Sequence, residues 1–560
     1  MHARELLTLH YYMPFTNIFS LALYLVIGGS LPLIVRLLRR TTIQVSLPGP
    51  PGGNLFYGHL QRIIGPTGPD YQEHIFSTYG TTTQIRGVLY SKALFTIDPM
   101  IIGAVLIKDK NKFERPQEAT IMVRSIFGGQ GGLLGITSDE HRSQRKLLSP
   151  GFTVKHLRER KITVFMNISK RICLSISKEL PKSTSPKELD LLKEAAAATL
   201  DTVGEIGFGY SFNSFGEDRN KYSDSVQEIT QSLVRIGPFI QLLPYVHRLG
   251  TPAFRQWILE IAPFSAIQQL RLAVKAQNEQ ASNILRARRE LISSGVDMSS
   301  EAGSGRDIIT LLMKEATGSK LSIDRETLVG HMNIFIAAGH ETASTAMARI
   351  LDLLAHNLDI QNTLRDELNH YFDTDSELNP EGLFELPYLD GVVREALRLY
   401  PPFTVITRVC QEDTVLPLAY PINTPSGKIA SIPIKKGTVV FLNNTFYNRH
   451  KDIWGERADE FLPERWVGKR LNEVTQTELR LPGVYSSMMT FGAGTHGCIG
   501  VKFAVMEIKA IVAGMIRKFK FGPATQECTW LNLGIQFPYL KADLENSNRL
   551  PKLFLKVEEL

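Results

Sequence analysis

A ten-residue loop near the end of the chain, Phe491 to Gly500, restricts what this sequence can fold into. It reads FGAGTHGCIG, and an apolar helical pattern over residues 504–519 follows it directly. Four glycines in ten residues allow close backbone approach and unusual dihedral angles, so the loop can press against a flat ligand. The positive end of the following helix favours the thiolate of Cys498, which is the reactive and metal-binding form.

Two other interpretations of Cys498 are open on the loop alone. A free cysteine is most often a small buried residue that contributes only packing. A zinc site is a weaker alternative, because His496 and Cys498 have no second ligand pair close by in the sequence.

Composition indicates a large folded unit in a reducing compartment. The chain has 560 residues, 43% of them hydrophobic, without an internal repeat or a long low-complexity linker after the first 60. Its four cysteines are widely spaced and form no CxxC pair, which does not fit a secreted disulfide framework. The net charge of +7 is mild for this length and comes without a basic, aromatic-rich run. It therefore indicates a basic patch for an acidic protein or a membrane surface, and no nucleic-acid partner.

Residue patterns predict a mainly α chain with minor β structure. Residues 89–99 and 437–444 are typical of short strands, whereas 190–209 and 504–519 have apolar residues at helical spacing. Residues 293–307 are polar and rich in glycine and serine, which predicts a flexible loop between two helices.

The N-terminal segment predicts a membrane anchor. Residues 15–35 contain no charge, and about 20 apolar residues are enough to cross a bilayer as a helix. Arg36, Arg39 and Arg40 follow, whereas Arg4 is the sole arginine or lysine before the run, so the rest of the chain is expected on the cytoplasmic side. A cleavable signal peptide is the alternative, although the charges lie on the wrong side for one.

Three regions follow from this division of the chain. Residues 1–40 are expected to form the N-terminal segment with its single anchor helix, and residues 57–560 to form one large domain that contains the cysteine loop. Between them, residues 41–56 include LPGPPGGN, whose prolines and glycines cannot form a helix or a central strand. This stretch is expected to be a stiff, bent tether.

The cysteine loop resembles the haem-binding signature of the cytochrome P-450 family, in which phenylalanine, glycine, arginine, cysteine and glycine occupy fixed positions. Phe491, Gly494, Cys498 and Gly500 match that signature in register, and His496 stands where the family has arginine. A histidine is shorter than arginine and titrates near neutrality, so it predicts weaker, pH-sensitive anchoring of a haem propionate.

Two further motifs occur in the family's order. EALR supplies Glu395 and Arg398 on one helical face, and PERW supplies Arg465. The resemblance implies that these three residues form a buried charged cluster behind the haem pocket. Removing one member would strand a buried charge, so we expect a structural role.

A fourth motif, FIAAGHETAST, resembles the family's central helix over the haem through Ala338, Gly339, Glu341 and Thr342. A carboxylate and a hydroxyl in such apolar surroundings are costly unless they are used. Thr342 can bond back to a carbonyl one turn earlier and open the helix locally. A zinc-protease interpretation of HETAS fails, because that motif needs histidine where Ser344 stands.

The resemblance extends over roughly residues 45–555 and adds weaker site residues. His141 and Arg145, four residues apart in HRSQR, match a pair that contacts haem propionates, and Arg408 matches a further contact. An exposed surface pair is the alternative for His141 and Arg145.

Together these matches imply a fold and a reaction. The fold is the helix-rich cytochrome P-450 fold with small β-sheets, holding a b-type haem whose iron is bound by the Cys498 thiolate. Thr342 is expected to hold water or oxygen and Glu341 to relay protons. One atom of O2 would enter a lipophilic substrate by hydroxylation or epoxidation.

Electrons are expected from NADPH through a membrane-bound cytochrome P-450 reductase, with cytochrome b5 as an optional second partner. Arg145, Lys146 and Lys502 are candidates for the basic docking surface. The expected location is the endoplasmic reticulum membrane, single-pass, with the catalytic domain in the cytosol. The sequons at Asn167 and Asn443 should then carry no glycan.

The expected walls of the substrate pocket are largely apolar, which favours a lipophilic substrate. They comprise residues 110–135, residues 230–245, Phe335, Ile336, Ala338, Phe403, Val405, Ile406 and the LGIQF turn at 533–537. The sequence as a whole resembles fungal members of the cytochrome P-450 family that modify terpenoids, other secondary metabolites or xenobiotics.

Alternatives to a monooxygenase remain open at this stage. They are a haem-thiolate isomerase or dehydratase, a non-enzymatic haem protein, and a membrane-anchored scaffold without haem.

Overall fold

The computed structural model describes residues 43–560 except 56, 66, 130, 182–184, 217–220, 237–239, 241–242, 295–306, 311–312, 314–323, 375–380, 533 and 547–548. The predicted anchor at 15–35 and most of the predicted loop at 293–307 therefore lie outside the described residues. Within the described ranges, no helix is both long and apolar enough to cross a membrane.

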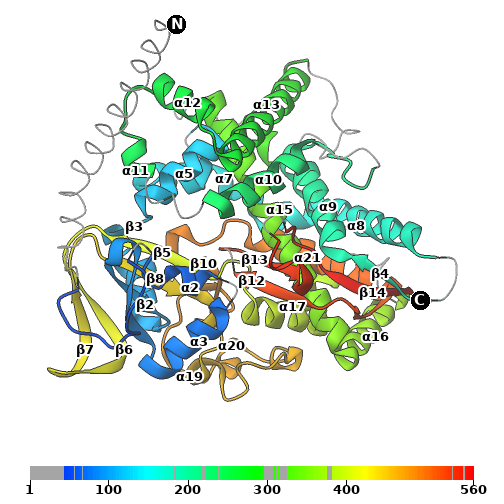
Figure 1. The fold of residues 1–560 in the computed structure, drawn as a ribbon. Coiled ribbons are helices and arrows are strands. Elements are labelled where there is room, and N and C mark those ends of the chain that lie inside the picture. The colour runs from blue at the N-terminus through cyan, green and yellow to red at the C-terminus, as the bar shows by residue number, and fades with distance from the viewer. Residues whose placement is uncertain are drawn as a thin grey trace, which may run out of the picture.

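A 32-residue helix, α15 (Arg325–His356), runs through the middle of the molecule (Figure 1). Asp324 begins it, because its carboxylate accepts a hydrogen bond from the Thr327 amide at 2.7 Å and so caps the free N–H groups. Helices α9 (Leu191–Val203), α13 (Ser265–Ser293), α17 (Pro387–Leu399) and α21 (Val501–Lys518) pack against it. The predicted helices at 190–209 and 504–519 correspond to α9, with the π-helical turn that follows it, and to α21.

Further helices complete the helical part. They are α2 (Leu60–Ile64), α3 (Gly68–Tyr79), α4 (Pro99–Gly103), α5 (Gln117–Phe127), α6 (Gly132–Gly135), α7 (Ser138–Leu148), α8 (Val154–Glu179), α10 (Lys221–Ile236), α11 (Leu243–Val246), α12 (Pro252–Ile261), α16 (Leu358–Thr374), α18 (Asn444–Tyr447), α19 (Lys451–Trp454) and α20 (Leu471–Val474).

The largest sheet has five strands and contains both strands predicted from the sequence. Its order is β1 (Thr82–Arg86), β2 (Lys92–Thr96), β8 (Val439–Asn443), β5 (Val405–Cys410) and β3 (Phe113–Glu114). Only β2 and β8 run parallel within it, with Ala93 opposite Val439. The antiparallel pairing of β3 with β5 brings Arg115 and Arg408, which follow and precede the paired residues, side by side.

Four small antiparallel sheets surround this body. They pair β6 (Thr414–Thr424) with β7 (Gly427–Ile434), β9 (Gly483–Tyr485) with β10 (Met488–Ala493), β12 (Cys528–Asn532) with β13 (Gln536–Leu540), and β14 (Phe554–Glu559) with both β11 (Phe519–Pro523) and β4 (Lys187–Asp190).

The segment expected to be a tether packs on the folded body where it is described. Ile43 is 1% exposed and forms a β-bridge with Ile434. The Pro48 carbonyl accepts a hydrogen bond from the Gln84 amide at 2.9 Å. Apolar burial and backbone pairing thus hold residues 43–48 in place, and the main buried cluster extends from Ile43 to Val557.

Glu395 is the fully buried centre of a charged cluster. Arg398, one turn along α17, grips both carboxylate oxygens, with its Nε at 2.9 Å from Oε2 and its Nη2 at 2.8 Å from Oε1. Arg465 donates to Oε1 at 3.1 Å, and the Trp466 indole donates to Oε2 at 2.9 Å. The structure therefore brings EALR and PERW together around one carboxylate that is 0% exposed.

Asn448 connects this cluster to the cysteine loop. The Arg398 Nη1 donates to its backbone carbonyl at 2.7 Å. Its amide side chain donates to the Thr490 hydroxyl at 2.9 Å and accepts from the Met489 amide at 2.7 Å. Because Met489 and Thr490 lie on β10, the strand that leads into the loop, the ion pair fixes the base of the loop.

We predict that Glu395→Ala lowers the free energy of unfolding by about 3–5 kcal/mol, because it leaves Arg398 and part of Arg465 charged and buried without their partner. Chemical denaturation followed by circular dichroism measures this loss. Glu460→Ala is the control, since Glu460 pairs with Arg457 in an exposed ion pair at 2.7 Å and should cost much less. Equal losses in the two variants would contradict a special role for the buried cluster.

Candidate active site

The cysteine loop connects β10 to α21 through a short 3₁₀ turn at Gly494–His496. The Cys498 amide donates to the Phe491 carbonyl at 2.8 Å, which closes the loop. Gly494 has a φ of +65°, and a Cβ there would lie 2.0 Å from the Leu106 carbonyl oxygen. Only glycine permits this contact, so the loop is pressed against the turn that contains Leu106.

Cys498 lies just before α21 and its side chain is accessible within a large cavity. Burial in the protein raises the pKa of its thiol, while the Gly500 amide and the charge of Arg145 lower it. A donor amide and a cation beside the sulfur are the environment in which a thiolate forms once a metal is bound. Within the described residues, no three histidine, cysteine, aspartate or glutamate side chains gather into a metal site.

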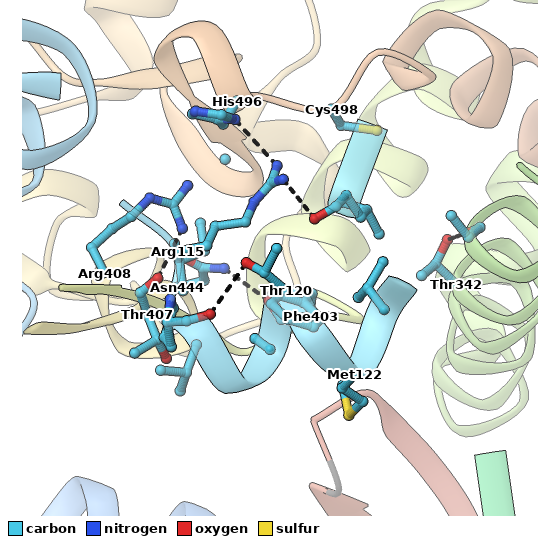
Figure 2. A pocket seen from close by; sticks show the side chains of 18 of the residues that line it. Arg115, Thr120, Met122, Thr342, Phe403, Thr407, Arg408, Asn444, His496 and Cys498 are labelled. Atoms are coloured by element: carbon cyan, nitrogen blue, oxygen red, sulfur yellow. Dashed lines mark hydrogen bonds between the residues drawn. The ribbon is translucent and has the colours of Figure 1, made fainter. Parts of the chain in front are cut away.

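The cavity has a volume of about 2040 Å³ and extends between α15, β5 and the segment around α5. Pockets for one drug-sized ligand are roughly 300–1,000 Å³, so this cavity has room for a cofactor and a substrate together. Cys498 and Thr342 face the same space, as Figure 2 shows.

Two arginines, Arg115 and Arg408, line one edge of the cavity, and a third arginine lies near them. Glu114 on β3 pairs with Val409 on β5, so the next residues in register, Arg115 and Arg408, are brought side by side. Burial is the main reason that the pKa of Arg115 and that of Arg408 each fall to about 10, and the charge of Arg408 further lowers the pKa of Arg115. Arg145 on α7 completes the group, since its charge acts on Arg115 and on Cys498.

Two histidines lie against these cations. The rings of His141 and His496 pack with centroids 4.1 Å apart. Burial and the arginine charges lower the pKa of His141 to about 4 and that of His496 to about 3. The expectation that His496 titrates near neutrality is therefore wrong for this surrounding, because protonation would add a charge among three guanidinium groups.

Charge balance defines what the arginine cluster can bind. Glu114 is a carboxylate whose charge acts on both Arg115 and Arg408. Three guanidinium charges less this one carboxylate leave a net charge of two. Buried cations are costly unless they are paired, so the edge is complementary to a ligand that carries two carboxylates.

Thr342 lies on α15 at the cavity wall, and its hydroxyl donates to the Ala338 carbonyl at 2.6 Å. The predicted back-bond is therefore present. The predicted local opening is not, because α15 is continuous through this region. Ala338, Gly339 and Ala343 also line the cavity here, and their small side chains leave space above the cysteine.

Glu341 is placed differently from the expectation for a proton relay. Its carboxylate accepts a short hydrogen bond from the Thr230 hydroxyl on α10 and is not among the cavity-lining groups of the described chain. Burial raises the pKa of Glu341 to about 7. The helical periodicity explains this, because consecutive residues 341 and 342 lie about 100° apart on the helix.

Several expected wall residues lie elsewhere. Ile336 is 0% exposed and packs in the core between helices. The described part of the LGIQF turn lies behind the wall, where Ile535 forms a β-bridge with Phe403. Arg145 contributes to the cation cluster rather than to an exposed docking face, whereas Lys146 and Lys502 are exposed.

Sequence reasoning missed three polar residues of the cavity. Arg115 lay inside the expected wall at 110–135 without a motif of its own. Glu507 on α21 is fully buried with a pKa raised well above its usual range by burial, and Asn444 has a buried Oδ1 without a hydrogen-bond partner among the described groups. The one available signal was the Glu507 carboxylate within the otherwise apolar helical stretch 504–519, whereas Arg115 lies in a polar, charged run.

Comparison with known proteins decides the family. The family profile described as Cytochrome P450 matches residues 48–541. The chain is 35% identical over 527 residues to cytochrome P450 monooxygenase 91 of Postia placenta, covering 93% of this chain and 96% of that protein. It is 31% identical over 528 residues to ganoderic acid synthetase CYP5150L8 of Ganoderma lucidum, covering 92% and 94%.

The chain belongs to the cytochrome P450 family.

Membership of the cytochrome P450 family makes this chain a haem-thiolate monooxygenase that uses NADPH through a reductase. Haem b carries two propionate carboxylates, and the excess of two positive charges at the arginine cluster fits them. The exposed Cys498 thiol at the start of α21 fits a ligand of the haem iron. The residues present therefore suit the cofactor of the P450 family.

The raised pKa of Glu341 predicts a pH-dependent stability. The folded-state pKa of this carboxyl is raised from about 4.5 to about 7. The free energy of unfolding of the protein therefore falls as the pH rises through that interval, by about 3 kcal/mol in total. Glu341→Gln mimics the protonated form, so its melting temperature should exceed that of the parent more at about pH 8 than at about pH 5.

Thr230→Val provides a second comparison. It removes the hydrogen bond that lowers the pKa of Glu341, so the pH dependence should become steeper. A constant difference between Glu341→Gln and the parent across this pH range would contradict the raised pKa.

Proposed function

We propose that this P450 inserts one oxygen atom from O2 into a lipophilic small molecule by hydroxylation or epoxidation, with Cys498 as the residue that would bind the haem iron. The observation that carries the proposal is the shared cavity. Cys498 lies at one side of it, Thr342 at the other, and the arginine cluster at one edge. Haem bound to a thiolate supplies oxygen activation, and the chain supplies position, charge and protons.

The chain's own residues would hold the haem in three ways. Cys498 supplies the ligand, supported by the Gly500 amide and Arg145. Arg115, Arg145 and Arg408 meet the two propionates, with His141 and His496 packed beside them. Phe491 and Gly494 keep the loop flat, because Phe491 packs edge-on against Tyr485 at 5.4 Å and Gly494 allows the contact with Leu106.

Protons would reach the reacting centre through Thr342. Its hydroxyl donates to the Ala338 carbonyl and can turn toward the cavity to donate to a water molecule instead. Glu341 would supply the next proton to Thr342 only after its carboxylate breaks the hydrogen bond with the Thr230 hydroxyl. Its pKa of about 7 suits proton exchange at neutral pH, because both forms are then populated.

The substrate is proposed to be a lipophilic secondary metabolite, such as a terpenoid, or a xenobiotic. The cavity wall is largely apolar, with Met122, Phe335, Phe403, Val405 and Ile406 among its residues. The name of the Ganoderma lucidum relative records ganoderic acid synthesis, which supports a fungal metabolite as the type of substrate.

We further propose that residues 15–35 anchor the protein in the endoplasmic reticulum membrane with the catalytic domain, 57–560, in the cytosol. Helix α12 and its flanks support this placement, since they carry Phe254, Trp257, Ile261 and Phe264 at 45–63% exposure. Exposed apolar surface of this kind is stable against lipid. Asn443 is fully buried and donates to Gln72, so that sequon cannot carry a glycan in the fold, whereas Asn167 is exposed.

A reductase would dock on the side of the cysteine loop. Lys146 on α7 and Lys502 at the start of α21 are exposed close to the elements that hold Cys498, and they would attract an acidic partner. Cytochrome b5 would use the same surface.

We predict that Thr342→Ala uncouples electron consumption from product formation. With the reductase and a turned-over substrate, NADPH should still be consumed while product per NADPH falls about tenfold or more, because proton delivery by a positioned group contributes about 10²–10⁴-fold. The measurement is the ratio of product to NADPH, with hydrogen peroxide assayed in parallel.

Thr345→Ala is the matched control one turn further along α15. Its hydroxyl donates to the Glu341 carbonyl at 3.0 Å and it is 2% exposed, away from the cavity. Its coupling should equal that of the parent. Product formation that needs neither O2 nor NADPH would contradict a monooxygenase.

A further inference from the structure

The C-terminal end of α5 is bonded by side chains of two other helices. The last carbonyls of a helix have no partner within it. The Asn333 Nδ2 on α15 donates to the Phe127 carbonyl at 3.0 Å, and the Gln277 Nε2 on α13 donates to the Ile126 carbonyl at 3.4 Å. Gly128 follows with a φ of +74°, a conformation that ends the helix. The end of α5 is therefore attached to α15 and α13.

The Asn333 side chain connects four helices. It is 0% exposed, and its Nδ2 also donates to the Asn278 Oδ1 on α13 at 2.7 Å. Its Oδ1 accepts from the Tyr222 hydroxyl on α10 at 2.8 Å. A backbone carbonyl can only accept, so the contact with Phe127 fixes the direction of the Asn333 amide. Both ends of one amide thus hold α5, α10, α13 and α15 together.

Apolar packing around this amide supplies burial without direction. Ile126, Ile229 and Ala273 form a buried cluster between α5, α10 and α13, with Met122 and Phe127 packed against it. Hydrophobic contacts are non-directional, so they tolerate rotation or sliding of α5. A buried hydrogen bond is directional and is costly to leave unmade. The hydrogen bonds of the amide therefore fix the position of α5.

Helix α5 forms one wall of the large cavity. Its Thr120 and Met122 line this space together with Thr342 on α15, as Figure 2 shows. Within the described chain, Asn333 is not a lining residue, but it lies on the same helix as Thr342, about 13 Å away along the axis. The amide therefore sets the position of the α5 wall relative to the helix that carries Thr342.

We propose that Asn333 is a specificity-determining positioning residue, whose amide holds the α5 wall in place and so limits how a long lipophilic substrate lies in the cavity. This inference rests on the proposed function of the cavity. A volume of about 2040 Å³ leaves a substrate room to shift beside a cofactor, so the wall decides which carbon atom is presented to the reacting centre. A ligand too small to reach α5 does not depend on Asn333.

Hydrogen exchange of the backbone amides of α5 in the full chain tests the attachment without any substrate. Asn333→Leu removes the donor and the acceptor at similar volume, so residues 124–127 should exchange about tenfold faster. Asn333→Ser is the milder variant, since its hydroxyl is shorter than the amide, and the same direction is expected. Unchanged exchange in a folded variant of Asn333 would overturn the proposal.

Thr199→Val is the matched control. The Thr199 hydroxyl is 0% exposed and lies 3.0 Å from His340 Nδ1 on α15, and its hydrogen bonds in the described chain lead to α9 and α15. The variant removes a buried hydrogen bond of the same long helix, so exchange in α5 should equal that of the parent. Equal acceleration in Thr199→Val and Asn333→Leu would indicate general loosening of α15 and would contradict the proposal.

Two imidazoles of different length separate positioning from general loosening. Their binding to the haem-loaded enzyme is followed by the shift of the haem absorption band. For Asn333→Leu, imidazole should bind with the parental Kd, whereas dodecylimidazole should bind several-fold more weakly, because the wall no longer restrains its chain. A parallel change in both Kd values, or no change in either, would refute the role of Asn333. A parent chain that takes up no haem would refute the haem site instead, and hydrogen exchange would still decide whether Asn333 holds α5.

Discussion

The buried carboxylate of Glu395 is the interaction on which the position of the active site depends. Arg398 on the same helix and the adjacent Arg465 and Trp466 surround it, so two separate segments of the chain meet at one charge. Because a buried charge tolerates little loss of its partners, these segments cannot shift independently. Asn448 hydrogen-bonds both Met489 and Thr490 and so connects the cluster to β10, the strand that leads into the loop with Cys498.

The edge of the cavity that Arg115 and Arg408 line carries positive charge that the fold leaves uncompensated. Register between β3 and β5 places Arg115 beside Arg408, and α7 adds Arg145. A protein that gathers these cations in a largely apolar cavity needs an anion to stabilise them. The same edge explains why a histidine is compatible with position 496, since a neutral ring relieves repulsion that a further cation would increase.

Sequence patterns were sufficient for the family, the helices α9 and α21 and two strands of the large sheet, because these depend on local spacing and on motifs in a fixed order. Thr342 was found with its back-bond for the same reason. Contacts between distant segments were not predictable: Arg115 lies 381 residues from His496, and the side to which Glu341 turns depends on Thr230 of α10. The packing of residues 43–48 was also missed, since prolines and glycines in that stretch are typical of a free tether.

Thiolate ligation by Cys498 is the central claim, and the absorption spectrum of the reduced, carbon-monoxide-bound protein tests it most directly. The account predicts the red-shifted band of a thiolate-bound haem in the parent protein and its loss in Cys498→Ala. A thiolate-type band that persists in Cys498→Ala, or a parent protein that binds no haem, would contradict the account.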